Sequence, residues 1–174
     1  MKIKKTRIPG QSLTGRFLPA DYTDSFSCEV ESRGDINADD IMISLWTDMP
    51  GAVKALFKVH NFLVKIVGLK GGNDHNTEEL EKCIRMGGEY GLVSVPAKDT
   101  GETVMKLSDK HLDAYMSVMV GDYGGKRILW FSTLVHYHNK LGWVYFFLIR
   151  PFHGIVVRKM VKRGLQKILQ NRYY

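Results

Sequence analysis

The sequence predicts an α+β protein in which a curved antiparallel sheet of about six strands wraps around a long C-terminal helix. Three observations predict this class. A strand-like segment at 24–30 precedes two helical segments, five segments rich in β-branched and aromatic residues follow at hairpin spacing, and an amphipathic helix opens near Pro151. The 174 residues contain no Pro/Ser-rich linker, so we expect a single domain over residues 1–174.

The first half of the chain alternates between strand and helix signals. Polar and mostly apolar residues alternate over 24–30, which predicts the first strand. Two helices are expected before the second strand. Asn37 is an acceptable N-cap for a short first helix, and the segment 52–69 carries only one narrow polar stripe, which predicts a helix buried on most sides. A further short helix is expected after Thr77, which could cap it.

The second half reads as an antiparallel meander. Hairpin-length connections built from turn formers separate the predicted strands, and Asn139–Gly142 is expected to form the last of these turns. Pro151 suits the first position of the terminal helix. Both faces of the last two strands are apolar, so one should meet that helix and the other should be covered by helices, a second subunit or lipid. The predicted strands are 90–95, 103–107, 112–120, 127–138 and 143–149.

The net charge of +7 is concentrated near the C-terminus. Residues 150–174 carry seven Lys or Arg and no acid, while the rest of the chain is balanced. A solvated helix face explains this most simply, and contact with a membrane surface or a partner protein is the alternative. No nucleic-acid partner is expected.

The start of the chain is basic, but no apolar segment follows it. The two cysteines lie far apart, so a cytoplasmic protein with reduced thiols is expected.

Six stretches of sequence carry a family resemblance. Over nearly its whole length the chain resembles a bacterial domain-of-unknown-function family, number twenty-eight sixty-seven. Its element order also resembles the START-type helix-grip superfamily, whose members bind lipids or polyketides in a cavity. The first resemblance implies no activity, and the second implies a helix-grip fold by analogy of topology. The matching stretches are 20–26, 50–56, 66–70, 109–113, 138–142 and 150–153, of which the last three together are the most specific.

The weak catalytic candidates are His111, Asp113 and His153. His111 and Asp113 are two residues apart in a predicted strand, so their side chains should leave the same face and could serve in acid/base chemistry. His153 would lie in the first turn of the terminal helix, where the helix dipole disfavours a charged imidazole. A polar pair at a strand entrance and a corner at the helix start are the structural alternatives.

Five residues are candidates for ligand binding. Arg150 could hold an anionic group by bidentate hydrogen bonds. His136 shares a strand face with His138, but a zinc site needs a third ligand that the sequence does not supply, so no metal and no cofactor are expected. The remaining candidates are Asn139, whose alternative role is turn chemistry, and the aromatic residues Trp143 and Tyr145.

The sequence specifies no reaction. The leading hypothesis is a binding domain whose cavity accepts an apolar or amphipathic small molecule. One alternative is an enzyme that uses His111, Asp113 and His153, with Arg150 orienting an acidic substrate. Another is an interaction module that uses the basic C-terminal helix at a membrane surface or on a partner protein. A homodimer would also cover an exposed apolar sheet face.

Overall fold

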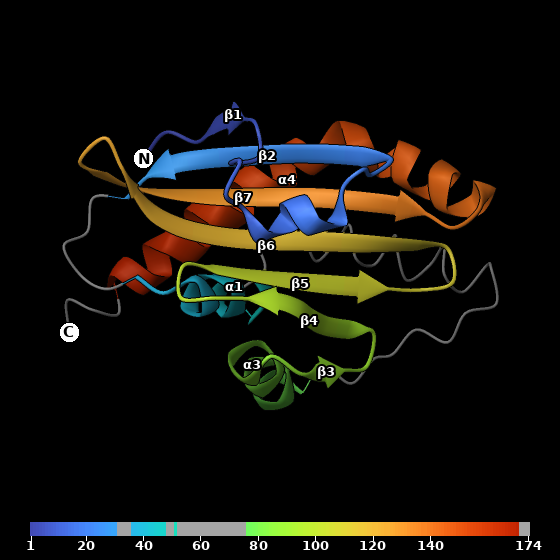
Figure 1. Cartoon of the computed structure of the whole chain (residues 1–174), viewed down its shortest axis with the longest axis horizontal. Coiled ribbons are helices and arrows are strands. Elements are labelled where there is room, and N and C mark those ends of the chain that lie inside the picture. Colours follow the sequence, from blue (N-terminus) through green and yellow to red (C-terminus); the bar gives the residue numbers. More distant parts are fainter. Residues whose placement is uncertain (31–35, 48–50, 52–75, 171–174) are drawn as a thin grey trace.

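The computed structural model describes residues 1–30, 36–47, 51 and 76–170 (Figure 1). Its described part is an α+β structure with a seven-stranded antiparallel sheet in the order β1-β2-β7-β6-β5-β4-β3. The predicted class, with an antiparallel sheet and a long C-terminal helix, is confirmed. The strands are β1 (Lys4–Thr6), β2 (Tyr22–Glu29), β3 (Glu89–Tyr90), β4 (Val93–Lys98), β5 (Glu102–Ser108), β6 (Leu112–Tyr123) and β7 (Lys126–Tyr137).

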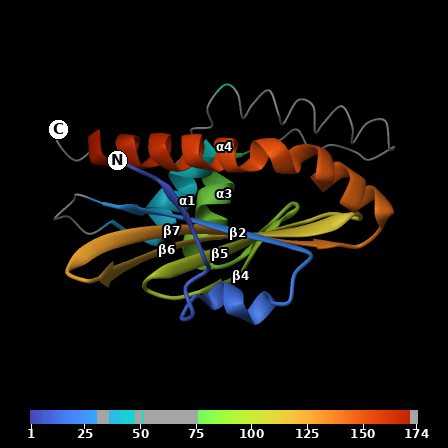
Figure 2. The ribbon, with the colours of Figure 1, turned by 90° about the horizontal axis from the view of Figure 1, so that it is seen from above.

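Helices cover one face of this sheet. Figure 2 shows α1 (Ala38–Thr47), α3 (Thr77–Met86) and α4 (Lys140–Gln170) on one side, and the short 3-10 helix η1 (Leu13–Phe17) on the other. The C-terminal half of α4 packs on α1, where the Ser44 hydroxyl donates a hydrogen bond to the Gly164 carbonyl at 3.3 Å. The sheet therefore does not wrap around the whole terminal helix as predicted, because α1 lies between them over this half.

The strand register explains which side chains enter the helix-covered core. Phe26, Phe131 and Val118 lie opposite one another on β2, β7 and β6, and all three are buried. Because side chains alternate along a strand, every second residue on either side of this row also faces the helices. Val157, Val161 and Leu165 of α4 belong to the same buried cluster. The terminal helix is thus amphipathic as predicted, with these three residues on its buried side.

The predicted last strand, 143–149, is wrong because this segment forms the first turns of α4. The run is apolar at almost every position, so it fits a buried strand as well as a buried helix. In the structure Gly142 and Phe146 are buried four residues apart, while Trp143 and Phe147 are exposed. This is the spacing of a helix.

The predicted turn at Asn139–Gly142 is instead the N-terminus of α4. The Asn139 side-chain oxygen accepts hydrogen bonds from the backbone N–H groups of Leu141 and Gly142, each at 3.1 Å. Asn serves both turns and N-caps, so the residue type alone does not separate them. A Cβ on Gly142 would lie 2.1 Å from the His111 carbonyl oxygen, which means that only glycine lets the helix start this close to the entrance of β6.

Pro151 lies inside α4 and not at its start. Proline has no N–H to donate and its ring crowds the preceding turn, so it bends a helix. Figure 2 shows the first turns of α4 inclined toward the sheet relative to the rest of the helix. His153 is consequently not in a first helical turn, and the predicted effect of the helix dipole on it does not apply.

The remaining predictions concern the caps of two helices, the strand expected at 90–95 and the helix expected at 52–69. Asn37 caps α1, since its side-chain oxygen accepts from the N–H of Asp39 at 2.9 Å. The helix expected after Thr77 is α3, but Asn76 and not Thr77 is its cap. The strand expected at 90–95 is divided into β3 and β4 by a turn with Gly91 at φ 59°. The helix expected at 52–69 lies outside the described residues.

Within the part of the chain that the structure describes, no helix has both the length and the apolar character needed to cross a bilayer.

Candidate functional site

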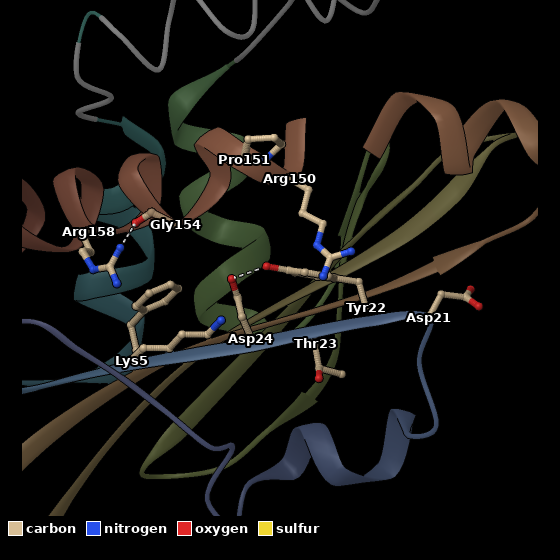
Figure 3. A pocket seen from close by; sticks show the side chains of 10 residues that line it. Lys5, Asp21, Tyr22, Thr23, Asp24, Arg150, Pro151, Gly154 and Arg158 are labelled. Carbon is tan, nitrogen blue, oxygen red and sulfur yellow. Dashed lines mark hydrogen bonds between the residues drawn. The ribbon is translucent and has the colours of Figure 1, made fainter. Parts of the chain in front are cut away.

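A cleft of about 410 Å³ lies between β1 and β2 on one side and the middle of α4 on the other (Figure 3). Pockets that hold small molecules in proteins are typically of this size or larger. Its walls combine basic, acidic and aromatic side chains. The lining residues are Lys5, Asp21, Tyr22, Thr23, Asp24, Phe26, Arg150, Pro151, Gly154 and Arg158.

Two regular spacings create the cleft. Tyr22, Asp24 and Phe26 are two residues apart on β2 and therefore face the same side, toward the helices. Arg150, Gly154 and Arg158 are four residues apart and form one stripe of α4. A Cβ on Gly154 would lie 3.4 Å from the Phe26 ring and 3.3 Å from Arg158 Nη1, so the absent side chain keeps the space open.

Three basic side chains surround the opening. The Arg150 guanidinium lies over the Tyr22 ring, 5.5 Å from its centroid, and that of Arg158 lies over the Phe26 ring at 4.7 Å. Arg158 also donates to the Gly154 carbonyl at 3.2 Å. Lys5 completes the set from β1. Among the described residues, none of the three forms an ion pair with a carboxylate.

The floor of the cleft is a buried polar network around Asp24. The Tyr22 hydroxyl donates to Asp24 Oδ2 at 2.7 Å, a bond drawn in Figure 3, and His153 Nε2 lies 3.4 Å from the same oxygen. His153 Nε2 is also 3.2 Å from the Thr133 hydroxyl on β7. The Asp24 side chain is only 1% exposed. Its other oxygen, Oδ1, has no hydrogen-bond partner among the residues described.

The protonation states of this network follow from its contacts. Burial raises the pKa of Asp24, but the hydrogen bond and charge of His153 and the hydrogen bond from Tyr22 outweigh it, so the pKa lies below its ordinary value. Burial, followed by the hydrogen bond to Asp24, raises the pKa of the Tyr22 hydroxyl. At neutral pH Asp24 is therefore a charged acceptor and Tyr22 a protonated donor.

Both carboxylates at the cleft already have partners. Asp21 Oδ2 accepts from the backbone N–H of Tyr137 at 2.7 Å, and Asp24 is held by Tyr22 and His153. Neither carboxylate forms an ion pair with Arg150 or Arg158, and Arg158 uses one guanidinium nitrogen, Nη1, for its hydrogen bond to the Gly154 carbonyl. The cleft can therefore offer positive charge to an acidic group.

Of the residues predicted from sequence, Arg150 lines this cleft, and His153 contacts the lining residue Asp24. Trp143 is on the same helix, 52% exposed, with its ring stacked on that of Phe147 at 5.3 Å. Tyr145 packs against a buried cluster formed by Leu112, Val135 and Phe146, and burial raises the pKa of its hydroxyl.

The structure does not bring His111, Asp113 and His153 together. Asp113 on β6 pairs with His136 on β7. His136 is three residues along β7 from Thr133, whose hydroxyl contacts His153. An odd separation places two strand residues on opposite faces, so Asp113 and His153 are separated by the sheet. The catalytic roles of the three residues stay predictions, but they do not belong to a common pocket.

These residues have other partners. Asp113 accepts from Ser108 at 2.5 Å and pairs with Lys106 at 2.8 Å and with His138 at 3.4 Å. Its pKa is lowered, since these bonds outweigh the effect of burial. His111 Nδ1 lies 3.3 Å from the side-chain nitrogen of Asn139.

His136 faces η1, on the side of the sheet away from the cleft. Its Nε2 lies 3.0 Å from the Phe17 carbonyl, and its ring meets that of Tyr115 edge-on at 5.6 Å. No group of three or more His, Cys, Asp or Glu side chains suited to a metal occurs in the described ranges.

Sequence reasoning missed Lys5, Tyr22, Asp24 and Arg158. A signal existed for two of them, because an aspartate two residues after a tyrosine in a strand places both groups on one face. No local pattern points to Lys5, which reaches the cleft only through the pairing of β1 with β2.

The comparison with protein families identifies the chain. The model of the family described as "Protein of unknown function (DUF2867)" matches residues 17–160, and the chain belongs to this family. No curated protein matches the chain, and no solved structure does. The likeness to START-type helix-grip proteins remains an expectation from the order of the elements.

Proposed function

We propose that this protein binds an amphipathic small molecule that carries an acidic group, and that the cleft between β2 and α4 is its binding site. One observation carries the proposal. Lys5, Arg150 and Arg158 converge on one cleft from two elements, and no described carboxylate pairs with them. Guanidinium groups held on aromatic faces bind carboxylates and phosphates by paired N–H donors.

The place for the apolar part of the ligand follows from helical spacing. Trp143, Phe147 and Arg150 are separated by four and three residues and so belong to one side of α4. The stacked rings of Trp143 and Phe147 are 52% and 56% exposed. At 1.5 Å per residue, Trp143 lies about 10 Å along the helix from Arg150. An acyl or aromatic group of that length would cover both rings while its acid meets Arg150.

The buried polar network around Asp24 positions the side chains of the cleft more than it attracts the ligand. The Asp24 side chain is buried, and its Oδ2 accepts a hydrogen bond from the Tyr22 hydroxyl and lies 3.4 Å from His153 Nε2. The same bonds fix the Tyr22 ring under the Arg150 guanidinium. We therefore expect Asp24 and His153 to shape the site without touching the acidic group of the ligand.

The second candidate function, an enzyme, would rest on the His153–Asp24 pair. This pair alone favours it little, because the Nε2 of His153 faces Asp24 and Thr133 in the interior. A general base needs its nitrogen within hydrogen-bond reach of the substrate. The binding function, in contrast, needs only groups that are already exposed in the cleft.

Isothermal titration with octanoate and octan-1-ol tests the proposal, because the two probes share a chain length and differ in charge. Octanoate should bind at least about tenfold more tightly, the ratio that one net charge-assisted hydrogen bond provides. Equal affinities for the two probes, or no heat from either, would contradict an acid-binding cleft. Native mass spectrometry of the freshly purified protein would then identify the molecule that accompanies it.

A further inference from the structure

The outer side of α4 carries a continuous apolar stripe. Its members are separated by three, four, four and three residues, the spacing that keeps side chains on one side of a helix. All are between 40% and 57% exposed. Over fourteen residues the stripe spans about 21 Å. Its residues are Leu141, Val144, Leu148, Phe152 and Ile155.

Large exposed apolar side chains are concentrated on this helix. Seven of the twelve that occur among the described residues lie on α4, between Leu141 and Ile155. Scattered apolar residues on a surface need no explanation, but a contiguous group indicates a site that another surface covers. The stripe contains no hydrogen-bonding side chain, so it offers no polar group by which to select one particular protein partner.

Positive charge continues the same side of the helix. Lys159 and Lys162 follow Ile155 at spacings of four and three residues, and both are exposed. The sequence of α4 contains no Asp or Glu. An apolar stripe that runs into a basic one is the pattern of helices that lie in the interface of an anionic bilayer, with the apolar side chains among the acyl chains and the lysines at the phosphates.

We infer that the outer side of α4 docks this protein on the surface of an anionic membrane. The apolar stripe supplies the contact, and Lys159 and Lys162 supply the preference for negative lipid. This inference does not depend on the proposed function, because Arg150 and Arg158 of the cleft belong to a different side of α4. If both hold, the protein would meet its amphipathic ligand at the membrane.

Vesicle co-sedimentation of the full chain tests the inference. Vesicles of phosphatidylcholine with about 30% phosphatidylglycerol should pellet the protein at about 0.1 M salt. Vesicles of phosphatidylcholine alone, or the mixed vesicles at about 0.5 M salt, should bind at least about tenfold less, because the attraction of exposed charges is screened. No binding of the unmodified protein to the mixed vesicles overturns the inference.

Double substitutions distinguish binding through α4 from a general effect of exposed apolar or charged residues. Phe152→Gln with Ile155→Gln, and separately Lys159→Gln with Lys162→Gln, should each lower binding at least about tenfold. Two matched controls should keep it within about twofold. Met86→Gln with Leu92→Gln removes exposed apolar groups elsewhere, and Lys82→Gln with Lys110→Gln removes exposed charge elsewhere.

Each outcome of the variants is decisive. If the apolar pair binds as the unmodified protein does, the stripe is not the contact and the inference fails. If the charge control loses as much as Lys159→Gln with Lys162→Gln, the attraction is a property of the net charge and not of α4. All these side chains are exposed, so circular dichroism should show an unchanged fold for every variant.

Discussion

His153 on α4 lies 3.4 Å from Asp24 on β2, through Nε2 and Oδ2, and this pair joins the long helix to the sheet beneath the cleft. The Asp24 carboxylate is 1% exposed and the His153 ring 15% exposed. An unpaired buried charge is costly, so each partner depends on the other. The pair therefore fixes the position of α4 relative to β2, and with it the positions of Arg150 and Arg158.

We expect His153→Ala to destabilise the protein by about 2–4 kcal/mol, because it leaves the buried Asp24 carboxylate with fewer partners. Urea unfolding followed by circular dichroism measures this. His138→Ala is the matched control, since it also removes a histidine near an aspartate, but one that is 38% exposed. Its loss should stay below about 1 kcal/mol. Equal losses would mean that His153 does not support a buried charge.

The contribution of Asp24 to stability should depend on pH in one direction. Its pKa in the folded protein is lowered, so its stabilising effect is complete above the ordinary carboxylate pKa of about 4 and is lost as the pH falls through the folded value. The difference in unfolding free energy between the unmodified protein and Asp24→Asn should thus have its full value just above about pH 4. It should shrink below about pH 4. A difference that grows in acid would show that the pKa is raised.

Gly142→Ala should destabilise the protein far more than Gly164→Ala. The new Cβ at 142 would lie 2.1 Å from the His111 carbonyl oxygen and 2.8 Å from its carbon, and backbone atoms cannot move aside without shifting α4. At 164 the nearest atom is Leu45 Cδ2 at 3.2 Å, which can adjust, and alanine gains about 1 kcal/mol of helix propensity.

Urea unfolding of both glycine variants measures the contrast. We expect a loss of about 3 kcal/mol or more for Gly142→Ala and a change within about 1 kcal/mol for Gly164→Ala. Similar values for the two would contradict the close approach of α4 to the entrance of β6.

Gly154→Leu should close the cleft, and circular dichroism checks that the variant is folded. A Cβ there already lies 3.3 Å from Arg158 Nη1 and 3.4 Å from the Phe26 ring, so a leucine would occupy the space between them. Octanoate binding should then fall at least about tenfold. Gly154→Ala adds only the Cβ. It is the control and should bind octanoate with an intermediate affinity. Unchanged binding by Gly154→Leu would place the ligand elsewhere.

The strands of the second half were predictable from sequence because their signals are local. β5, β6 and β7 alternate or carry β-branched and aromatic residues between clear turns, and their predicted bounds agree with the structure to within a few residues. The first turns of α4 were not predictable in the same way. A run such as Trp143–Ile149 has no polar position that would reveal its period, and Asn139 and Pro151 each have a second structural use.

The cleft was predictable only in part. Arg150 and His153 were expected from one sequence stretch; Arg150 lines the cleft, and His153 contacts Asp24, which also lines it. Their partners Tyr22 and Asp24 are more than a hundred residues away in the chain and meet them only because β2 pairs with β7 beneath α4. The separation of Asp113 from His153 has the same origin, since sequence spacing within one strand says nothing about which face α4 covers.

The affinity of Arg150→Met for octanoate, measured by isothermal titration beside Lys167→Met, tests the central claim most directly. Both variants remove one exposed positive charge from α4, but only Arg150 lines the cleft. We expect Arg150→Met to lose about 10- to 100-fold in affinity and Lys167→Met to stay within about twofold of the unmodified protein. An Arg150→Met protein that binds octanoate as tightly as the Lys167→Met protein would contradict the claim that this cleft holds the acidic group.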